Sequence, residues 1–377
     1  MERSLKPSDL TEIPHQILEE AVRAGIEKDD SKRAGTLMHV DRETIYTKIN
    51  EKFRNQIEFM DVKDAIKKYP WVDDYRWKIV DRDKDEYTRK VAEDFSGGYF
   101  IHVKENADIT FPLQACLMMA QKEIEQKIYN IIIVEEGANV NIISTCVQHS
   151  QAKKASHLGI TEYFLKKDSY LNFTMVHSWS EDTFVRPRSA AVLDDGAVFI
   201  SNYLSLRPAK DVQMYPVAYC NGKGSKASIN SILYGHTNTK LDIGSAAILN
   251  GPESAADMIS RAISRNGSEM ILRGRIEAHD PTARGHLECK GLLLDEKSFI
   301  HSIPELIASK GGAELSHEAS VGKISDKEIS YLMTRRMSEE DAISMIIRGF
   351  MDVGILGLPP QLEKEVDKVI DLTADAS

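Results

Sequence analysis

The chain has 377 residues and a formal net charge of −10 at pH 7. A chain of this length can bury a hydrophobic core without disulfides or metal ions for stability. Lysine and arginine are dispersed among acidic residues, so the composition gives no basis for binding nucleic-acid phosphates. No apolar run reaches the roughly 18 residues of a membrane helix, and residues 1–9 lack the apolar core of a signal peptide. We expect neither secretion nor insertion into a membrane.

The cysteines are few and scattered. The chain contains Cys116, Cys146, Cys220 and Cys289, with no pair spaced as CxxC. This pattern argues against a zinc ribbon and against a disulfide framework. A reducing compartment, the cytoplasm, fits best.

The first part of the chain reads as helical. Ile13, Ile17, Leu18, Val22 and Ile26 recur at helical spacing, and so do Ile45, Ile49 and Phe53 after Asp41. A third short helical pattern covers Val62–Lys68 and is ended by Pro70. The sequence therefore predicts an N-terminal helical region.

From about Gly98 the hydrophobic period changes to two. Alternating segments are separated by Gly, Asn, Asp and Ser turns, without helical patterns between them; they are Tyr99–Val103, Tyr129–Val134, Val140–Cys146, Tyr170–His177, Ala197–Leu206, Ser228–Tyr234, Ile243–Leu249, Met270–Ala278 and Leu287–Leu294. This excludes a βαβ sheet and leaves a sandwich, a barrel or a solenoid. Small-residue stretches at 244–247, 264–267 and 311–313 resemble the tight corners of a solenoid.

After Lys323 the pattern returns to helix. Ser325 and Ser338 each begin a capping-box pattern, and Pro359 can open a last short helix through Val369. In the helix after Ser338 one apolar face is formed by Ile343, Ile346, Ile347 and Phe350. This face either docks a partner protein or covers the open end of the strand-rich region, and the sequence leaves both open.

Two enzyme classes find little support. Gly222–Lys226 lacks the spacing of a nucleotide-binding loop, so we do not expect the chain to hydrolyse ATP. A β-helical carbohydrate-active enzyme would use clustered carboxylates. The candidate pair, in Asp194-Asp195-Gly196, is better explained as a tight turn, because Asp-Gly is a typical turn sequence.

A thiol, an imidazole and a carboxylate come close together near the end of the strand region. They are Cys289, His317 and Glu318, a mixed ligand set suited to iron or to an iron–sulfur cluster. Strand alternation places Cys289 on the apolar face, and it points His317 and Glu318 in opposite directions. One regular chain therefore cannot aim all three at one ion, and either a kinked backbone or two chains must contribute.

Three stretches carry a resemblance to a known family. They are Gly285–Leu294 (GHLECKGLLL), Ser316–Ile324 (SHEASVGKI) and Ser338–Ile347 (SEEDAISMII). In order and spacing the chain resembles the SufB/SufD family, the scaffold subunits of the SUF iron–sulfur assembly machinery. The resemblance implies a mainly β protein with a right-handed parallel β-helix core at 97–323, an N-terminal helical region at 1–96 and a C-terminal helical domain at 324–377.

The resemblance also implies a function. In the family, two β-helices pair and a nascent cluster is built at their interface, from a cysteine and a glutamate that fall on Cys289 and Glu318 and a histidine that falls on His317. Because this chain carries all three, it resembles a minimal type in which a homodimer replaces the SufB–SufD pair. The implied partners are a SufC-like ATPase of the ABC type, docked on the C-terminal helices, a sulfur donor and recipient apo-proteins. Whether reduced flavin supplies electrons stays open, as does the alternative of a SufD-like structural partner without a cluster of its own.

One departure from the family concerns the point where sulfur enters. A second SufB cysteine follows a Tyr-Pro pair by two residues, whereas Tyr215-Pro216 is followed at that position by Ala218. Cys220 lies two residues further on and is the candidate substitute; a buried structural cysteine is the competing interpretation.

Overall fold

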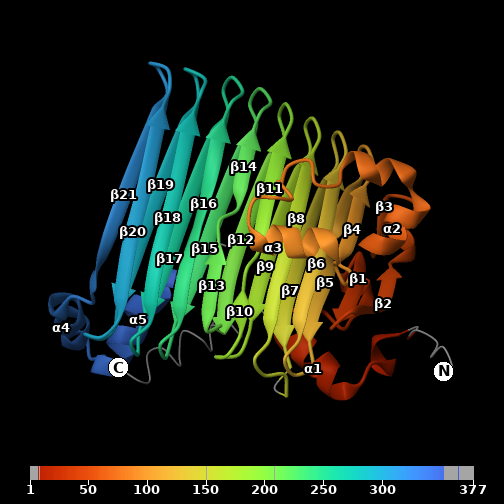
Figure 1. Cartoon of the computed structure of the whole chain (residues 1–377). Helices are drawn as coiled ribbons and strands as arrows, with labels where there is room; N and C mark the ends of the chain where they lie inside the picture. The colour runs from red at the N-terminus through yellow and green to blue at the C-terminus, as the bar shows by residue number, and fades with distance from the viewer. Residues whose placement is uncertain (1–6, 8, 150, 208, 352–363, 365–377) are drawn as a thin grey trace.

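Two sheets stacked face to face form the body of the molecule (Figure 1). The computed structural model describes residues 7, 9–149, 151–207, 209–351 and 364. Sheet A contains, in spatial order, β2 (Glu43–Ile49), β1 (Gly35–Val40), β5 (Asp108–Met119), β7 (Asn139–Gln148), β9 (Tyr170–Ser178), β12 (Val198–Arg207), β15 (Lys226–Gly235), β17 (Ala255–Ser264), β19 (Arg284–Leu293) and β21 (Glu314–Lys323). Sheet B contains β10 (Phe184–Val185), β13 (Asp211–Met214), β16 (Lys240–Leu249), β14 (Val217–Cys220), β11 (Arg188–Leu193), β8 (Ser156–Leu165), β6 (Glu125–Val134), β4 (Tyr99–Val103), β3 (Ile57–Asp61), β18 (Glu269–Ala278) and β20 (Phe299–Ala308).

The chain crosses from one sheet to the other with almost every strand, which makes a parallel β-helix. Lys226 pairs with Ala255, which pairs with Arg284 and then with Glu314, so that one coil takes about 29 residues, within the range of solenoid repeats. Alternate side chains of each strand point between the sheets, and those of neighbouring coils stack into the core; examples are Leu233, Met258, Ile276 and Leu287. The predicted β-helix is confirmed.

The predicted corners are confirmed at two of three places. Asn266 and Gly267 turn between β17 and β18 with φ of 53° and 73°, and Gly312 turns before β21 with φ of 109°. The corner predicted at 244–247 is wrong, because these residues lie inside β16. Gly244 is small for another reason: a Cβ there would meet the Cβ of Arg273 on the next coil at 2.4 Å.

The N-terminal region is only partly helical. Helices α1 (His15–Arg23) and α2 (Val62–Lys68) lie where the sequence predicts helices, and α3 (Glu86–Glu93) follows. The helix predicted from Ile45 to Phe53 is wrong, because β2 runs to Ile49, pairs antiparallel with β1 and extends sheet A, and Glu51–Phe53 form only a short 3-10 helix. Antiparallel β3 likewise ends sheet B, so the first residues close one end of the solenoid and are not a separate helical unit.

A buried carboxylate fixes the segment that leads into α3. Glu162 on β8 accepts hydrogen bonds from the backbone N–H groups of Trp77, Ile79 and Val80 at 2.7, 2.6 and 3.0 Å, and from the hydroxyl of Tyr129. These amides lie outside helices and strands, and the Trp77 N–H also donates to the Tyr129 hydroxyl at 2.8 Å. The segment is therefore held on the outer face of sheet B, where α3 crosses the strands (Figure 1).

The C-terminal helices α4 (Asp326–Thr334) and α5 (Glu339–Met351) follow the last strand. The cap predicted at Ser338 is confirmed, since its hydroxyl accepts the backbone N–H of Asp341 at 3.1 Å. Ser325 is the N-cap residue of α4, as predicted, but its side chain does not make the predicted cap hydrogen bond. The short helix predicted from Pro359 to Val369 falls outside the described residues. Among the residues that are described, no helix is long and apolar enough to cross a membrane.

Candidate iron–sulfur assembly site

Cys289 lies on β19 and points into the solenoid. Its neighbours on the same face, Leu287 and Gly291, are buried with it, as strand alternation predicts. The side chain is 1% exposed. Burial raises the pKa of the Cys289 thiol above its ordinary value of 9.0, and the nearby Ser302 hydroxyl of β20 opposes the shift. The thiol is therefore protonated at neutral pH and must release its proton to bind a metal ion.

This raised pKa gives a prediction about reactivity. Only the thiolate reacts with iodoacetamide, so modification of Cys289 should be slow at pH 7 and rise about tenfold per pH unit until the pH exceeds the thiol pKa. The midpoint of this pH dependence should lie above pH 9.0. The rate at each pH is measured by peptide mass mapping after timed alkylation. A midpoint at or below pH 8 would show that the Cys289 thiol is more accessible to solvent than it is in the structure.

His317 and Glu318 lie on the last strand, β21. Register pairs Leu287 with His317, Glu288 with Glu318 and Cys289 with Ala319. His317 therefore shares the inner face with Cys289, on the neighbouring coil, while Glu318 points to the outer face of sheet A. Both side chains are exposed, because no strand of the described residues covers β21. Among the residues that the structure describes, no group of three or more His, Cys, Asp and Glu is placed to hold a metal ion.

Glu318 belongs to a row of charges on the outer face of sheet A. Lys290 Nζ lies 3.1 Å from Glu318 Oε1 and 3.0 Å from Glu288 Oε2, and Arg261 pairs with Glu288. The hydrogen bond from Lys290 and its positive charge lower the pKa of the Glu318 carboxyl. Glu318 is consequently ionised at neutral pH and would have to exchange Lys290 for a metal ion in order to act as a ligand.

The solenoid is open at the end where this site lies. Within the described part of the chain, β20 pairs only with β18 and β21 only with β19, so each presents one unpaired edge. Apolar side chains of the last coil are exposed there, Val321 by 42% and Leu306 by 36%. Long unpaired edges beside exposed apolar side chains are typical of a surface that pairs with another chain.

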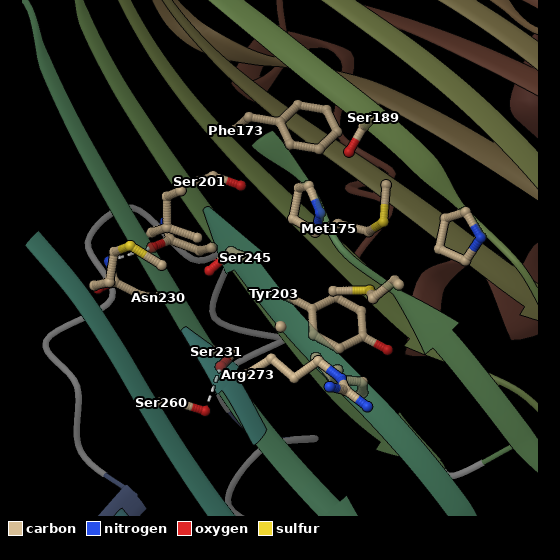
Figure 2. A pocket seen from close by; sticks show the side chains of 18 of the residues that line it. Phe173, Met175, Ser189, Ser201, Tyr203, Asn230, Ser231, Ser245, Ser260 and Arg273 are labelled. Atoms are coloured by element: carbon tan, nitrogen blue, oxygen red, sulfur yellow. Dashed lines mark hydrogen bonds between the residues drawn. The ribbon is translucent and has the colours of Figure 1, made fainter. Parts of the chain in front are cut away.

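A cavity inside the solenoid reaches Cys289. It has a volume of about 60 Å³ and is lined from Gly159 on β8 to Leu287 and Cys289 on β19. Figure 2 shows hydroxyl groups along it, with Ser231 and Ser260 hydrogen-bonded to each other at 2.9 Å. Register places Tyr203, Ser231, Ser260 and Cys289 next to one another on successive strands. The thiol thus stands at the end of a column of hydroxyl groups.

Comparison with known proteins decides the family. The family model for the "SUF system FeS cluster assembly, SufBD core domain" matches residues 117–350. The chain belongs to the SufBD family.

Full-length relatives agree with this assignment. The chain is 44% identical over 348 residues to an iron–sulfur cluster assembly SufBD family protein of Archaeoglobus fulgidus, covering 92% of both chains. It is 42% identical over 366 residues to one of Methanothermobacter thermautotrophicus, covering 96% of this chain and 88% of the relative. A SufBD family protein of Staphylococcus epidermidis is 27% identical over 385 residues, covering 99% of this chain and 82% of the relative.

Cys220, the candidate for sulfur entry in this SufBD protein, is placed away from the cavity. It ends β14, is buried, and is absent from the lining that contains Cys289. Burial raises the pKa of its thiol to about 12, against an opposing hydrogen bond with Ser225. Its role in sulfur transfer stays a prediction.

The apolar face of α5 is occupied by the protein itself. Ile347 and Met351 are buried against Ile232, Ile263 and Leu292 on the outer face of sheet A, and Ile343 and Phe350 pack at the edge of this cluster. Ile346 is half-buried. The predicted contact of this face with a partner would require α5 to leave sheet A, and it stays a prediction. The other interpretation, that this face covers the open end of the strand region, is wrong, because α5 covers a side of the β-helix.

Sequence reasoning missed the residues around Cys289. Ser231 and Ser260 occupy inward positions of their strands, where the alternation calls for apolar side chains. Polar residues at inward positions could therefore have indicated the site. Ser302 could not have been found in this way, because its strand, β20, contains Pro304 and was not predicted.

Proposed function

We propose that this SufBD protein is a scaffold on which an iron–sulfur cluster is built at Cys289, between two copies of the chain. The observation that carries the proposal is the placement of a buried thiol one coil from an open solenoid end that bears His317 and Glu318. The cluster is the cargo of this scaffold. It passes to recipient apo-proteins, and few thiolate ligands favour its release.

The homodimer is proposed from the open end. Strands β20 and β21 each offer a ten-residue edge of unpaired backbone groups, and a second copy can pair with both. Such pairing would cover Leu306 and Val321. It would also place His317 and Glu318 of both copies at the junction, one strand away from the Cys289 of their own copy, so that the site lies between two chains.

The ATPase partner is proposed on the free side of the C-terminal helices. Tyr331 and Met333 of α4 and Met345 of α5 are exposed by 58%, 44% and 52%, and the residues that the structure describes leave this apolar group uncovered. A scaffold of this kind would be no enzyme in its own right and would depend on a SufC-like ABC-type ATPase for energy. We place this work in the cytoplasm, where the four cysteines, which are free in the structure, would stay reduced.

The ATPase contact can be tested with a matched pair of substitutions. Tyr331→Asp and Met345→Asp should lower co-purification of the ATPase at least about tenfold, because each introduces a charge into the proposed interface, while the melting temperature changes little. Ile347→Asp is the control for a structural effect, since it buries a charge against sheet A and should melt first. Normal ATPase binding by both exposed-site variants would contradict the assignment of this surface.

Cluster assembly itself is tested by anaerobic reconstitution with ferrous iron and sulfide. We expect iron and acid-labile sulfide to co-elute with the protein and to give visible absorption. A SufD-like structural partner would fold and dimerise but retain no iron at Cys289, and that result would favour the alternative function.

A further inference from the structure

Four charged side chains form the row on the outer face of sheet A that runs from β17 to β21. Arg261 of β17 pairs with Glu288 of β19. Lys290 Nζ then lies 3.0 Å from Glu288 Oε2 and 3.1 Å from Glu318 Oε1 of β21. Positive and negative charges thus alternate along the row, which ends at a proposed cluster ligand, Glu318. Lys290 also directly follows the other proposed ligand of its strand, Cys289.

The register places like charges directly opposite each other in this row. Glu288 and Glu318 are partners on neighbouring parallel strands, and so are Arg261 and Lys290. Like charges at such positions repel each other, because neighbouring strands lie only about 4.8 Å apart. The ammonium group of Lys290 contacts both carboxylates and offsets their repulsion. Lys290 therefore takes the place of a cation between Glu288 and Glu318.

The row is fixed at one end and free at the other. Arg261 and Glu288 are largely buried, and the Arg261 guanidinium also lies 6.0 Å from the centre of the Phe350 ring of α5. The Glu318 side chain, in contrast, is 59% exposed. If Glu318 leaves the row, Lys290 keeps its pair with Glu288, so no buried charge loses its partner. Glu318 is consequently the member of the row that can move at little cost.

The contact between Lys290 and Glu318 is weak enough to be exchanged for a metal ion. An ion pair with an exposed partner contributes little to stability, because water screens it and both side chains lose freedom when it forms. A ferrous ion carries two positive charges and forms coordinate bonds to carboxylate oxygen, so it can displace an ammonium group. Within the described part of the chain, β21 has one unpaired edge, and no further strand of this copy blocks the movement of Glu318 there.

We propose that Lys290 is a positioning residue of the cluster site, which holds the Glu318 carboxylate on the outer face until iron binds and competes with iron for it afterwards. This inference rests on the proposed function and adds to it a means of release. Glu318 passes from the ammonium group to iron as the cluster is built, and this exchange transfers no proton and no electron. While the cluster is bound, Lys290 keeps competing for Glu318. The cluster is therefore held less tightly and passes more easily to a recipient protein.

The competition can be measured as the rate at which a chelator removes the cluster from the full chain. The protein is reconstituted anaerobically with ferrous iron and sulfide, and bathophenanthroline disulfonate is added while the visible absorption of the cluster is followed. Lys290→Met removes the ammonium group and keeps the length of the side chain. It should slow the loss of the cluster about threefold to fivefold, the range expected for competition by one exposed ion pair. Lys290→Gln should have the same effect, whereas Lys290→Arg keeps the charge and should lose the cluster at about the unaltered rate.

A double-mutant cycle separates competition for Glu318 from a general effect of charge. Glu318→Gln removes one ligand and should lose the cluster faster than the unaltered protein. In this background Lys290→Met should change the rate no further, because no carboxylate is left at position 318 to compete for. Lys323→Met is the matched control, since it removes a positive charge from the same strand, where Lys323 pairs with Glu296 at 3.4 Å. Its rate should stay near that of the unaltered protein.

The outcomes separate this role of Lys290 from the proposed function. Slower loss in Lys290→Met and Lys290→Gln, seen only while Glu318 is present, supports the proposal, with melting temperatures showing that the compared proteins are folded. An unaltered rate in either folded variant overturns it, as does equal slowing in the Glu318→Gln background or in Lys323→Met. A Glu318→Gln protein that loses the cluster no faster than the unaltered protein also overturns it. A failure of the proposed function shows separately, as absence of a cluster in the unaltered protein supplied with iron and sulfide.

Discussion

Cys289→Ser should abolish retention of the cluster while leaving the fold intact. The thiolate is the one soft ligand at the site, and a serine hydroxyl does not ionise to replace it at neutral pH. We expect bound iron and acid-labile sulfide per chain to fall at least about tenfold, which corresponds to roughly 1.4 kcal/mol or more of lost binding free energy. The measurement is metal and sulfide content after anaerobic reconstitution and desalting, with the melting temperature recorded alongside.

The control for this variant is Cys220→Ser. Cys220 is as deeply buried as Cys289, but it does not line the cavity. The Cys220→Ser protein should retain the cluster even if the substitution lowers the stability of the fold. If folded Cys289→Ser protein holds as much cluster as the unaltered protein, Cys289 is not a ligand of the cluster.

A charge at the open end of the solenoid should break the dimer and lose the cluster with it. Val321→Asp alters an exposed side chain of the last strand, so the isolated chain should fold normally. In a dimer joined through β20 and β21 the new carboxylate would be buried without a partner. We expect a cost of about 3 kcal/mol, or roughly a hundredfold in the dimer Kd.

Sedimentation or light scattering across a concentration series measures this change, and reconstitution follows on the same samples. Phe184→Asp is the matched control, since Phe184 is similarly exposed at 41% but lies on β10, away from the last coil. It should remain dimeric. A Val321→Asp protein that dimerises as tightly as the control would place the interface elsewhere on the molecule.

The strand region could be predicted from the sequence because each coil repeats the same alternation. Strand β18 lies within one residue of its predicted bounds, since buried and less buried positions alternate along it without interruption. The placement of Cys289 on the inner face follows from the same rule. Local pattern is sufficient where burial on one face decides the conformation.

Prediction failed where one spacing satisfied two structures. Ile45, Ile49 and Phe53 are four residues apart, which puts them on one side of a helix and equally on one side of a strand. The neighbouring Thr44 and Thr47, both β-branched, favoured the strand that forms. Gly244 led to a wrong prediction for a similar reason. The close approach of Arg273 requires a glycine there, but in the sequence such a glycine looks like the glycine of a turn.

The surroundings of the site depend on contacts between distant residues and were beyond a local pattern. The apolar face of α5 is evident in the sequence, but its partner, the outer face of sheet A, is not. The cavity is lined by residues as far apart in the sequence as Gly159 and Cys289. Neither can be inferred without knowing the register of the solenoid.

Mössbauer spectroscopy of the protein reconstituted anaerobically with isotopically enriched iron tests the central claim most directly. The account predicts a signal of sulfur-bridged, cluster-type iron in the unaltered dimer, absent from Cys289→Ser. A spectrum of isolated ferrous ions alone in the unaltered protein, or the same cluster signal with and without the Cys289 thiol, would contradict it.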